Sequence, residues 1–191
     1  MINMFKRLGA FFLDIIEVIV FAVAIFLFVY LLIMQPHKIK GASMHPNFPD
    51  GEYLLTDKVS YRFGEPNRGD VVVFKAPTNN GEEFIKRIIG LPGERVSIKN
   101  GKIYINEELL EEKYLDPTVY SSAGNFLQEG ATVVIPGGEY FVLGDNRSHS
   151  SDSRAWGVVE KKEITGRAWL VYWQGWPPKL PEFVQRPTYN F

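Results

Sequence analysis

The alternation of apolar and polar residues changes character once along the chain, close to the N-terminus. Residues Val18 to Met34 read VIVFAVAIFLFVYLLIM and carry no charge. As a helix rising about 1.5 Å per residue, this stretch is about 26 Å long, close to the roughly 30 Å of a bilayer core. A buried globular helix is the alternative, but such helices rarely lack a polar stripe over this length. The pattern predicts a membrane-spanning helix, which we place at residues 11–35.

The residues after this stretch indicate an uncleaved anchor rather than a removable leader. The apolar stretch exceeds the roughly 7–15 residues of a leader, and the QPHKIK that follows has no small-residue cleavage site. Charge does not decide the orientation. Lys6 and Arg7 precede the helix, but His37, Lys38 and Lys40 follow it, so the positive-inside rule is nearly balanced.

Beyond Pro36 the pattern changes to short apolar runs separated by turn residues, which is typical of β-strands. The clearest of these runs is a hairpin over Arg95–Asn106, where Asn100-Gly101 has the chemistry of a type I′ turn. The predicted pairs on its shared face are Val96 with Ile105 and Ile98 with Ile103. The other predicted strands are Tyr53–Thr56, Asp70–Phe74, Phe84–Ile89, Glu139–Leu143 and Ala168–Trp173.

The remaining segments lack a regular pattern. Residues 107–130 are polar and are predicted to form a surface insertion, and residues 176–191 are too rich in proline for a regular element. Residues 1–10 precede the helix. The chain is therefore expected to hold one mostly β domain, residues 36–175, attached to a single N-terminal helix.

The composition of the chain excludes several classes of partner and of catalytic or metal site. The net charge of −1 gives no reason to expect a nucleic-acid partner. The absence of cysteine excludes disulfides, thiolate zinc sites and cysteine nucleophiles. The three histidines are scattered without a metal-binding spacing, and Gly137-Gly138 leads into a strand instead of a phosphate-binding helix. We expect neither a metal nor a cofactor.

Lys86 is the first candidate for chemistry. Strand alternation places it on one face with Phe84 and Ile88. A lysine between apolar side chains loses hydration, which lowers its pKa toward the roughly 7–8 that a general base needs. Such a lysine can take the proton of a serine hydroxyl. From alternation alone, however, a lysine that extends to water is the simpler interpretation.

Four stretches in order behind the helix resemble the bacterial type I signal peptidases. They read GASMHP at residues 41–46, RGDVVVF at 68–74, KRIIGLPGE at 86–94 and GDNRSHSSDSR at 144–154, the last followed by Trp156-Gly157. The resemblance extends from the helix to about Trp173. It implies a mostly β domain whose antiparallel sheet is barrel-like and catalytic, behind one transmembrane anchor.

The resemblance assigns roles to matching positions. Ser43 is the expected nucleophile and Lys86 the expected general base, with Ser150 orienting the lysine through a hydrogen bond. Asp152 and Arg154 match an acidic and basic pair that braces their loop. Asp145 is expected to act in that scaffold, together with Asn146 and Arg147.

The resemblance also implies an oxyanion hole and a substrate pocket. The backbone N–H of Ser43 matches one oxyanion donor. Gly41 stands where some relatives have a serine, so a backbone or water donor must substitute there. The residues expected to line shallow pockets for small side chains are Ile39, Met44, Phe84 and Ile85. Asn47-Phe48 departs from the Thr-Leu common in the family, and the larger ring is expected to reshape the first pocket.

The implied function is a membrane-bound serine endopeptidase that removes signal peptides from exported preproteins after a small-x-small site. Its partners are preprotein signal peptides and the lipid bilayer. The family places the N-terminus in the cytoplasm and the catalytic domain outside a single-pass plasma-membrane anchor. Trp169, Trp173 and Trp176 form a candidate interfacial patch, although core packing explains one or two of them equally well.

Three other interpretations remain open. A Ser-His-Asp triad of Ser43, His149 and Asp152 is the first, as in the archaeal and eukaryotic signal peptidases; His45 lies too close to the nucleophile. A self-cleaving Ser-Lys protein of the phage-repressor type is the second, against which the membrane helix argues. A non-catalytic membrane-anchored scaffold is the third.

Overall fold

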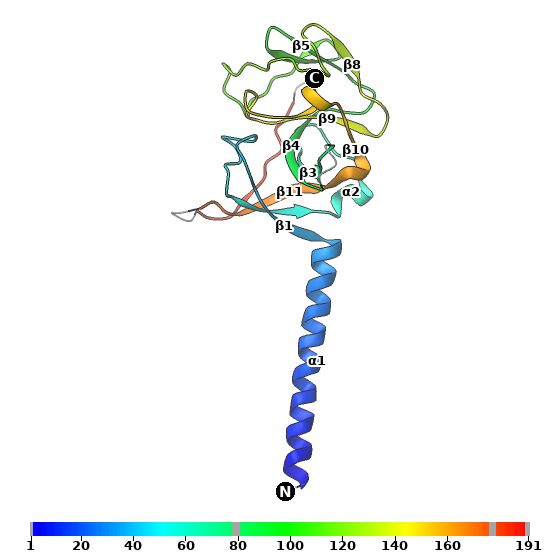
Figure 1. The fold of residues 1–191 in the computed structure, drawn as a ribbon, viewed down its shortest axis with the longest axis vertical. Helices are drawn as coiled ribbons and strands as arrows, with labels where there is room; N and C mark the ends of the chain where they lie inside the picture. Colours follow the sequence, from blue (N-terminus) through cyan, green and yellow to red (C-terminus); the bar gives the residue numbers. More distant parts are fainter. Residues whose placement is uncertain (1, 78–80, 176–178, 190–191) are drawn as a thin grey trace.

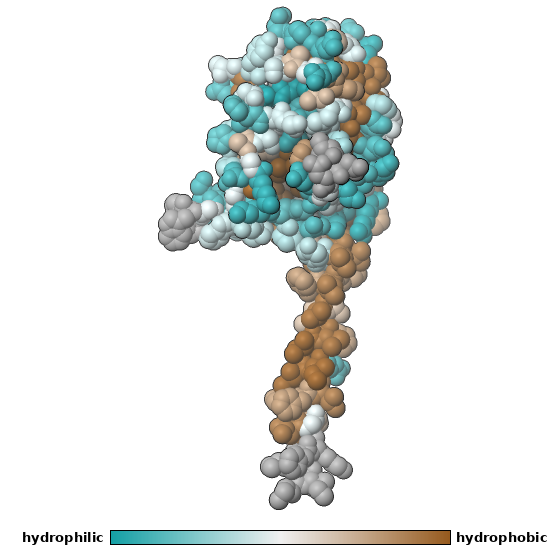
Figure 2. All heavy atoms as spheres, in the orientation of Figure 1, coloured by the Kyte–Doolittle hydropathy of each residue, from teal (hydrophilic) through white to brown (hydrophobic). Residues whose placement is uncertain are grey.

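A computed structural model describes residues 2–77, 81–175 and 179–189 of the chain. Helix α1 (Ile2–Leu32) projects as a rod from a β-rich domain (Figure 1). Its segment Arg7–Leu32 is long and apolar enough to cross a membrane, and it is not buried against the rest of the chain. Figure 2 shows this helix as an apolar column below a largely polar domain. An exposed apolar column of this length fits a membrane anchor.

The helix ends earlier than residue 35. After Leu32 the chain enters strand β1 (Met34–Lys38), which pairs with β2 (Tyr53–Asp57). The last two residues assigned to the membrane segment therefore belong to the β domain. Pro36 obscured this strand in the sequence, but β1 is an edge strand, where a proline is tolerated.

The larger sheet is antiparallel and has the strand order β1-β2-β11-β3-β4-β9-β10, with β12 added to β11. Its other strands are β3 (Val71–Lys75), β4 (Glu83–Gly90), β9 (Glu139–Leu143), β10 (Val159–Glu160), β11 (Ile164–Trp173) and β12 (Glu182–Phe183). Strands β3 and β9 are mostly buried, as their near-continuous apolar runs indicate, and β4 between them is mostly buried although it contains Lys86 and Arg87. This sheet carries Lys86 on β4, and the loop between β1 and β2 carries Ser43.

The smaller sheet has the order β7-β6-β5-β8 and lies at the end of the domain farther from α1 (Figure 1). Its strands are β5 (Arg95–Lys99), β6 (Lys102–Ile105), β7 (Glu108–Leu109) and β8 (Thr132–Val134). The predicted hairpin register is confirmed, with Val96 opposite Ile105 and Ile98 opposite Ile103. Asn100 and Gly101 both have positive φ, as a type I′ turn requires.

Short helices complete the domain: α2 (Ser60–Phe63), α3 (Ser153–Trp156) and the 3-10 turn η1 (Lys161–Glu163). One buried cluster joins the smaller sheet to β4 and β9, and another packs β2, β3 and β11 against Ile39, Met44 and Phe48. The prediction of a mostly antiparallel β domain behind one apolar helix is confirmed for the described residues.

The two segments without a sequence pattern are more ordered than expected. The polar insertion 107–130 contributes Leu110 and Leu127 to the core, although most of its residues are exposed. In the tail, β12 pairs with β11, and Tyr189 packs against the core cluster that includes Phe141. Single buried residues at irregular spacing create no periodicity, so neither arrangement could be seen in the sequence.

Candidate active site

The loop that carries Ser43 is held at both ends and at its centre. Gly51 N–H donates to the Ile39 carbonyl at 3.0 Å and closes the loop. Met44 is fully buried in the core, and Asn146 N–H donates to the Ser43 carbonyl at 3.0 Å. These contacts fix the backbone on either side of a half-buried serine.

Lys86 reaches this serine from the middle of β4. Its Nζ lies 2.7 Å from Ser43 Oγ and donates to the Ile85 carbonyl at 2.9 Å. The ammonium also lies 5.3 Å from the centre of the Phe84 ring, the neighbour predicted from alternation. The residue is 4% exposed, and among the described residues no carboxylate forms an ion pair with it.

This environment decides the charge of the lysine. Burial lowers the pKa of Lys86 to about 8, against the opposing attraction of Asp152 and Asp145. About a tenth of the side chains are then neutral amines at pH 7, compared with far below one per cent for a lysine of ordinary pKa. A neutral amine 2.7 Å from a hydroxyl can accept its proton, so the pair can act as a nucleophile with its base.

Ser150 lies beside this pair but does not make the expected hydrogen bond. Its Oγ is buried and has no hydrogen-bond partner in the described part of the chain, and Lys86 donates to Ser43 and Ile85 instead. A Cβ on Gly144 would lie 2.2 Å from Ser150 Oγ and 2.4 Å from the Ser43 carbonyl oxygen. The glycine therefore allows the two serine segments to approach closely.

The two expected oxyanion positions differ in their availability. Gly41 N–H donates to Asp50 Oδ1 at 2.7 Å, so it is already engaged. Ser43 N–H makes no hydrogen bond to any described residue and remains available as a donor. Gly41 has a φ of +86°, and a Cβ there would meet open space. Of the Gly41 and Ser43 backbone N–H groups, only that of Ser43 is therefore available to an oxyanion.

Buried ion pairs brace the loop after β9. Arg154 donates to both carboxylate oxygens of Asp152 at 2.8 Å, and Asp152 also accepts from Gly144 N–H. Asp145 forms a second buried pair with Arg87, whose Nε and terminal nitrogen lie 2.9 and 2.6 Å from its oxygens.

The insertion contributes to the same framework. Arg147 is buried and forms an ion pair with Glu112 and a 2.7 Å hydrogen bond to Ser121. The roles of Arg87 and Glu112 were missed in the sequence. A charged residue in a strand of buried residues could have indicated a structural role for Arg87. Nothing in the sequence distinguished Glu112 from the other charged residues of the insertion.

The pair of Ser43 and Lys86 opens into a cleft of about 350 Å³. Of the four residues expected to line the substrate pocket, Ile39, Phe84 and Ile85 line this cleft. Met44 does not, because its side chain points into the core, where its sulfur accepts from Asp145 N–H. The assignment of Met44 to the substrate pocket is therefore corrected.

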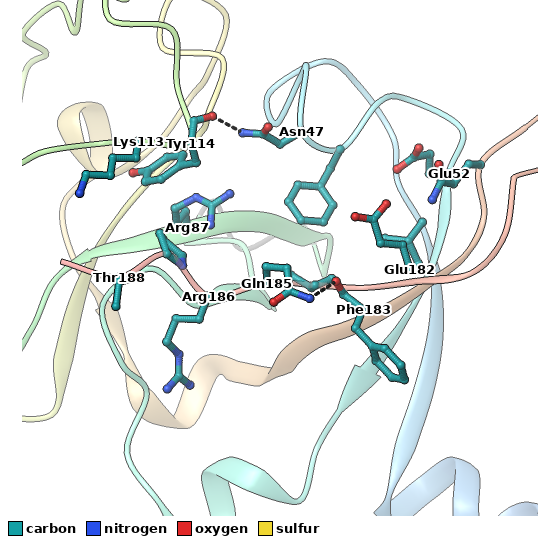
Figure 3. Close-up of a pocket in the computed structure, with 15 residues that line it drawn as sticks. Asn47, Glu52, Arg87, Lys113, Tyr114, Glu182, Phe183, Gln185, Arg186 and Thr188 are labelled. Atoms are coloured by element: carbon teal, nitrogen blue, oxygen red, sulfur yellow. Dashed lines mark hydrogen bonds between the residues drawn. The ribbon is translucent and has the colours of Figure 1, made fainter.

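Phe48 also lies away from the cleft. It belongs to the wall of a separate hollow of about 440 Å³, which the tail residues 182–188 help to enclose (Figure 3). Neighbouring Asn47 donates to the Tyr114 carbonyl and to Asp145. The expected effect of Asn47-Phe48 on the first pocket is not supported, because neither side chain lines the cleft.

The histidines do not assemble a triad. His149 is exposed and contacts Ser148, while Asp152 is occupied by Arg154. His37 lines the cleft and contacts Glu83 at 3.2 Å, and burial lowers its pKa despite that carboxylate. Among the described residues, no group of three or more His, Cys, Asp or Glu side chains could hold a metal ion.

Comparisons with known proteins agree with this geometry. The family described as "Signal peptidase, peptidase S26" matches residues 12–173. Signal peptidase IB of Staphylococcus aureus (strain COL) is 35% identical over 174 residues, which cover 84% of this chain and 90% of the relative. Probable signal peptidase I-2 of Synechocystis sp. is 36% identical over 168 residues, 84% of this chain and 73% of the relative.

Among solved structures, a signal peptidase I from Enterococcus faecalis V583 is 34% identical, with a TM-score of 0.46. That likeness covers 55% of this chain and 97% of the other. The family match spans most of the chain and includes the loop of Ser43 and the strand of Lys86. The chain therefore belongs to the signal peptidase I family, peptidases that remove signal peptides from preproteins.

Proposed function

We propose that the chain cleaves signal peptides with Ser43 as nucleophile and Lys86 as general base. The observation that carries this proposal is the 2.7 Å contact between Lys86 Nζ and Ser43 Oγ, made by a buried lysine that forms no ion pair with any described residue. A solvated or ion-paired lysine would stay protonated and could not accept the serine proton.

The reaction follows from this contact. The neutral Lys86 amine takes the proton of Ser43 Oγ while the oxygen attacks the scissile carbonyl carbon. The Ser43 N–H stabilises the oxyanion that forms. The Lys86 ammonium then gives its proton to the leaving amine, and an ester joins Ser43 to the signal peptide. Lys86 next activates a water that hydrolyses this ester and regenerates the serine.

The cleft suits an extended peptide. Strand β1 is at the edge of the larger sheet, and residues 83–86 of β4 pair with β3 on one side, whereas β9 pairs only from Arg87 onward. Two free strand edges thus contribute to the cleft, and a substrate can bind them through main-chain hydrogen bonds. Ile39, Phe84 and Ile85 then select small side chains before the cut.

The remaining assignments concern positioning. Ser150 is proposed to act on Lys86 after a rotation of its hydroxyl, which forms no hydrogen bond with any described residue. Asp152 with Arg154, and Asp145 with Arg87, hold the loop that contacts the Ser43 carbonyl. None of these residues is proposed to react.

The membrane arrangement is also a proposal. Residues 1–10 lie in the cytoplasm, α1 crosses the plasma membrane once, and the β domain, which begins with β1 at Met34, lies outside. The apolar α1 supports the crossing of the membrane. The resemblance of the chain to signal peptidases supports the orientation. Trp173 is 43% exposed and available to the bilayer interface, whereas Trp169 packs against Phe183. Trp176 lies outside the described residues.

A digest of a model preprotein by the full chain in detergent tests the proposal. Mass spectrometry should find a single cut after a small-x-small site with the natural chain, and no product with Ser43→Ala or Lys86→Ala. Circular dichroism should show both variants folded. Turnover retained by either variant would contradict the mechanism, and failure of the natural chain to cut any leader would favour the scaffold interpretation.

A further inference from the structure

A basic pocket lies outside the cleft, between α2 and the η1–β11 junction. Its volume is about 450 Å³, and its cationic lining residues are Lys58, Arg62, Lys161 and Lys162. Tyr61, Ile164 and Thr165 complete the wall, so the described lining includes no carboxylate. Such a concentration of positive charge in a chain with a net charge of −1 indicates an anionic ligand.

The pocket sits at the level where the membrane helix enters the domain. Lys58 N–H donates to the Ile33 carbonyl at 2.9 Å, one residue after the end of α1, and Lys58 Nζ donates to Gln35 Oε1 at 3.1 Å. Helix α2 lies beside the domain end of α1 (Figure 1). Because the apolar span extends to Leu32, these cations lie near the depth of the lipid headgroups.

The cations are available to a ligand. Lys58 Nζ contacts a neutral amide, and Arg62 makes no ion pair among the described residues. Lys162 pairs with Glu160 at 2.6 Å, but both side chains are more than half exposed. Lys161 pairs with Glu65, whose side chain is 71% exposed, and also donates to the Gly64 carbonyl at 3.2 Å. Exposed pairs of this kind add little stability, so a phosphate group can replace the glutamates.

An exposed aromatic residue directly follows Arg62 in the chain. Phe63 is the last residue of α2 and is 89% exposed, and it belongs to none of the described core clusters. An aromatic ring next to lysine and arginine is the arrangement typical of a membrane interface, where the ring enters the acyl boundary while the cations meet the headgroups.

We infer that Lys58, Arg62, Lys161 and Lys162 form a binding site for the phosphate headgroup of an anionic membrane lipid, with Phe63 inserted beside it. The inference rests on the proposed membrane anchoring by α1. A lipid at this site gives the domain a second attachment point beside the helix. The domain then cannot rotate freely about α1, and its cleft keeps one orientation relative to the bilayer.

Retention of lipid by the full chain tests this site. The chain is equilibrated with equal amounts of phosphatidylglycerol and phosphatidylcholine in neutral detergent, and the bound lipids are counted by native mass spectrometry. Each basic residue near an anionic surface contributes about fivefold to binding, so Arg62→Gln/Lys162→Gln should lower phosphatidylglycerol retention roughly 25-fold. Equal retention by this variant and the natural chain would overturn the inference.

A matched control separates the site from general charge. Arg95→Gln/Lys99→Gln removes the same two charge types from β5, and Arg95, like Lys162, pairs with an exposed glutamate. This control should retain phosphatidylglycerol as the natural chain does, and an equal loss would overturn the site. Release of the lipid by an equal concentration of inorganic phosphate would show a free-anion site and contradict the assignment to lipid.

Because the chain has no cysteine, a single introduced cysteine can carry a dye that measures whether position 63 inserts into the bilayer. An environment-sensitive dye attached through Phe63→Cys should shift to the blue in phosphatidylglycerol nanodiscs, whereas the same dye at Tyr120→Cys, a 60% exposed position beside the smaller sheet, should not. Identical spectra at both positions would contradict insertion. Cleavage of a soluble leader peptide in detergent should be unchanged in Arg62→Gln/Lys162→Gln, so failure of the lipid site and failure of the proposed peptidase activity are distinguishable.

Discussion

Two neighbouring cations on β4 have opposite surroundings. Lys86 is buried against Phe84 and forms no ion pair within the described part of the chain, and burial lowers its pKa to about 8. Arg87 is equally buried, but Asp145 accepts two of its hydrogen bonds and the Tyr114 ring lies 4.0 Å from its guanidinium. Burial lowers the pKa of Arg87, but Asp145, with smaller contributions from Tyr114 and Tyr189, more than reverses that effect, so the pKa is raised. The partner, not burial itself, decides whether a buried cation keeps its proton.

The two residues point to opposite faces because strand neighbours alternate. The Lys86 face meets the cleft and Ser43, whereas the Arg87 face meets the loop after β9 and the insertion. One face can therefore exchange a proton while the other holds the backbone that carries the nucleophile. Variants on each face should separate these two roles.

The largest effect is expected for Lys86→Met, which should reduce cleavage at least about thousandfold by removing the base. The same variant should raise the free energy of unfolding, because a buried unpaired cation is replaced by an apolar side chain. Product formation and thermal melting measure the two effects. Lys75→Met, at an exposed strand lysine, is the matched control and should change neither. A less stable Lys86→Met would contradict this account.

Arg87→Met should have the opposite effect on stability. It leaves the Asp145 carboxylate buried and unpaired, which typically costs about 3–5 kcal/mol. Denaturant unfolding of the full chain in detergent measures the loss. Adding Asp145→Leu should restore a large part of it, and an unchanged unfolding midpoint in the single variant would show that the ion pair is not structural.

Gly144→Ala tests the close approach between the Ser43 and Ser150 segments. The new methyl group would lie 2.4 Å from the Ser43 carbonyl oxygen and must displace the nucleophile's backbone. A displacement of about 1 Å at a catalytic group can cost about a hundredfold in rate. Gly137→Ala meets nothing within 4 Å and serves as the control. Equal rates in both variants would contradict the close packing.

The pH dependence of kcat/KM tests the charge of Lys86. The free amine is the active form, so the rate should rise about tenfold per pH unit below about 8 and level off above it. A limb that continues to rise above about pH 9 would contradict the lowered pKa.

The pH dependence of the free energy of unfolding also tests the ionisation of Lys86, and its direction can be predicted. The folded pKa of Lys86 lies below its unfolded value of about 10.4, so protonated Lys86 destabilises the fold at low pH. The stability gained by Lys86→Met, roughly 3 kcal/mol, should be constant below about pH 8 and disappear between about pH 8 and 10.4. A difference that is independent of pH over this range would show that Lys86 does not titrate there.

The smallest effect is expected for Ser150→Ala. The rate should fall less than about tenfold, since the residue is proposed to position the base without reacting. Melting should be unchanged or slightly higher, because the buried hydroxyl has no partner to lose. The pH limb should shift if Ser150 acts through Lys86, whereas a purely structural role would leave the limb in place.

Local chemistry explains what the sequence could predict. The turn at Asn100-Gly101 determines the hairpin register within a few residues. The length of the apolar segment in α1 is enough to indicate that the helix could cross a membrane. The pairing of Ser43 with Lys86 joins residues 43 positions apart, and only resemblance brought them together before the fold was known.

Side-chain direction and long-range pairing could not be predicted. Met44 follows the nucleophile in the sequence, yet its side chain is fully buried in the core, where it anchors the loop. The free Ser150 hydroxyl, the insertion's Glu112 and the tail's Tyr189 depend on segments that meet only in the folded domain. Such contacts leave no period in the sequence.

The most direct test of the central claim is the titration of Lys86 itself. Lysine side chains labelled with ¹³C at Cε are followed by NMR in the full chain in detergent, and the Lys86 signal is assigned by its absence in Lys86→Met. The account predicts a midpoint near pH 8, well separated from the exposed lysines. A midpoint near the ordinary value of about 10.4 would mean that Lys86 is charged at neutral pH and cannot be the base for Ser43.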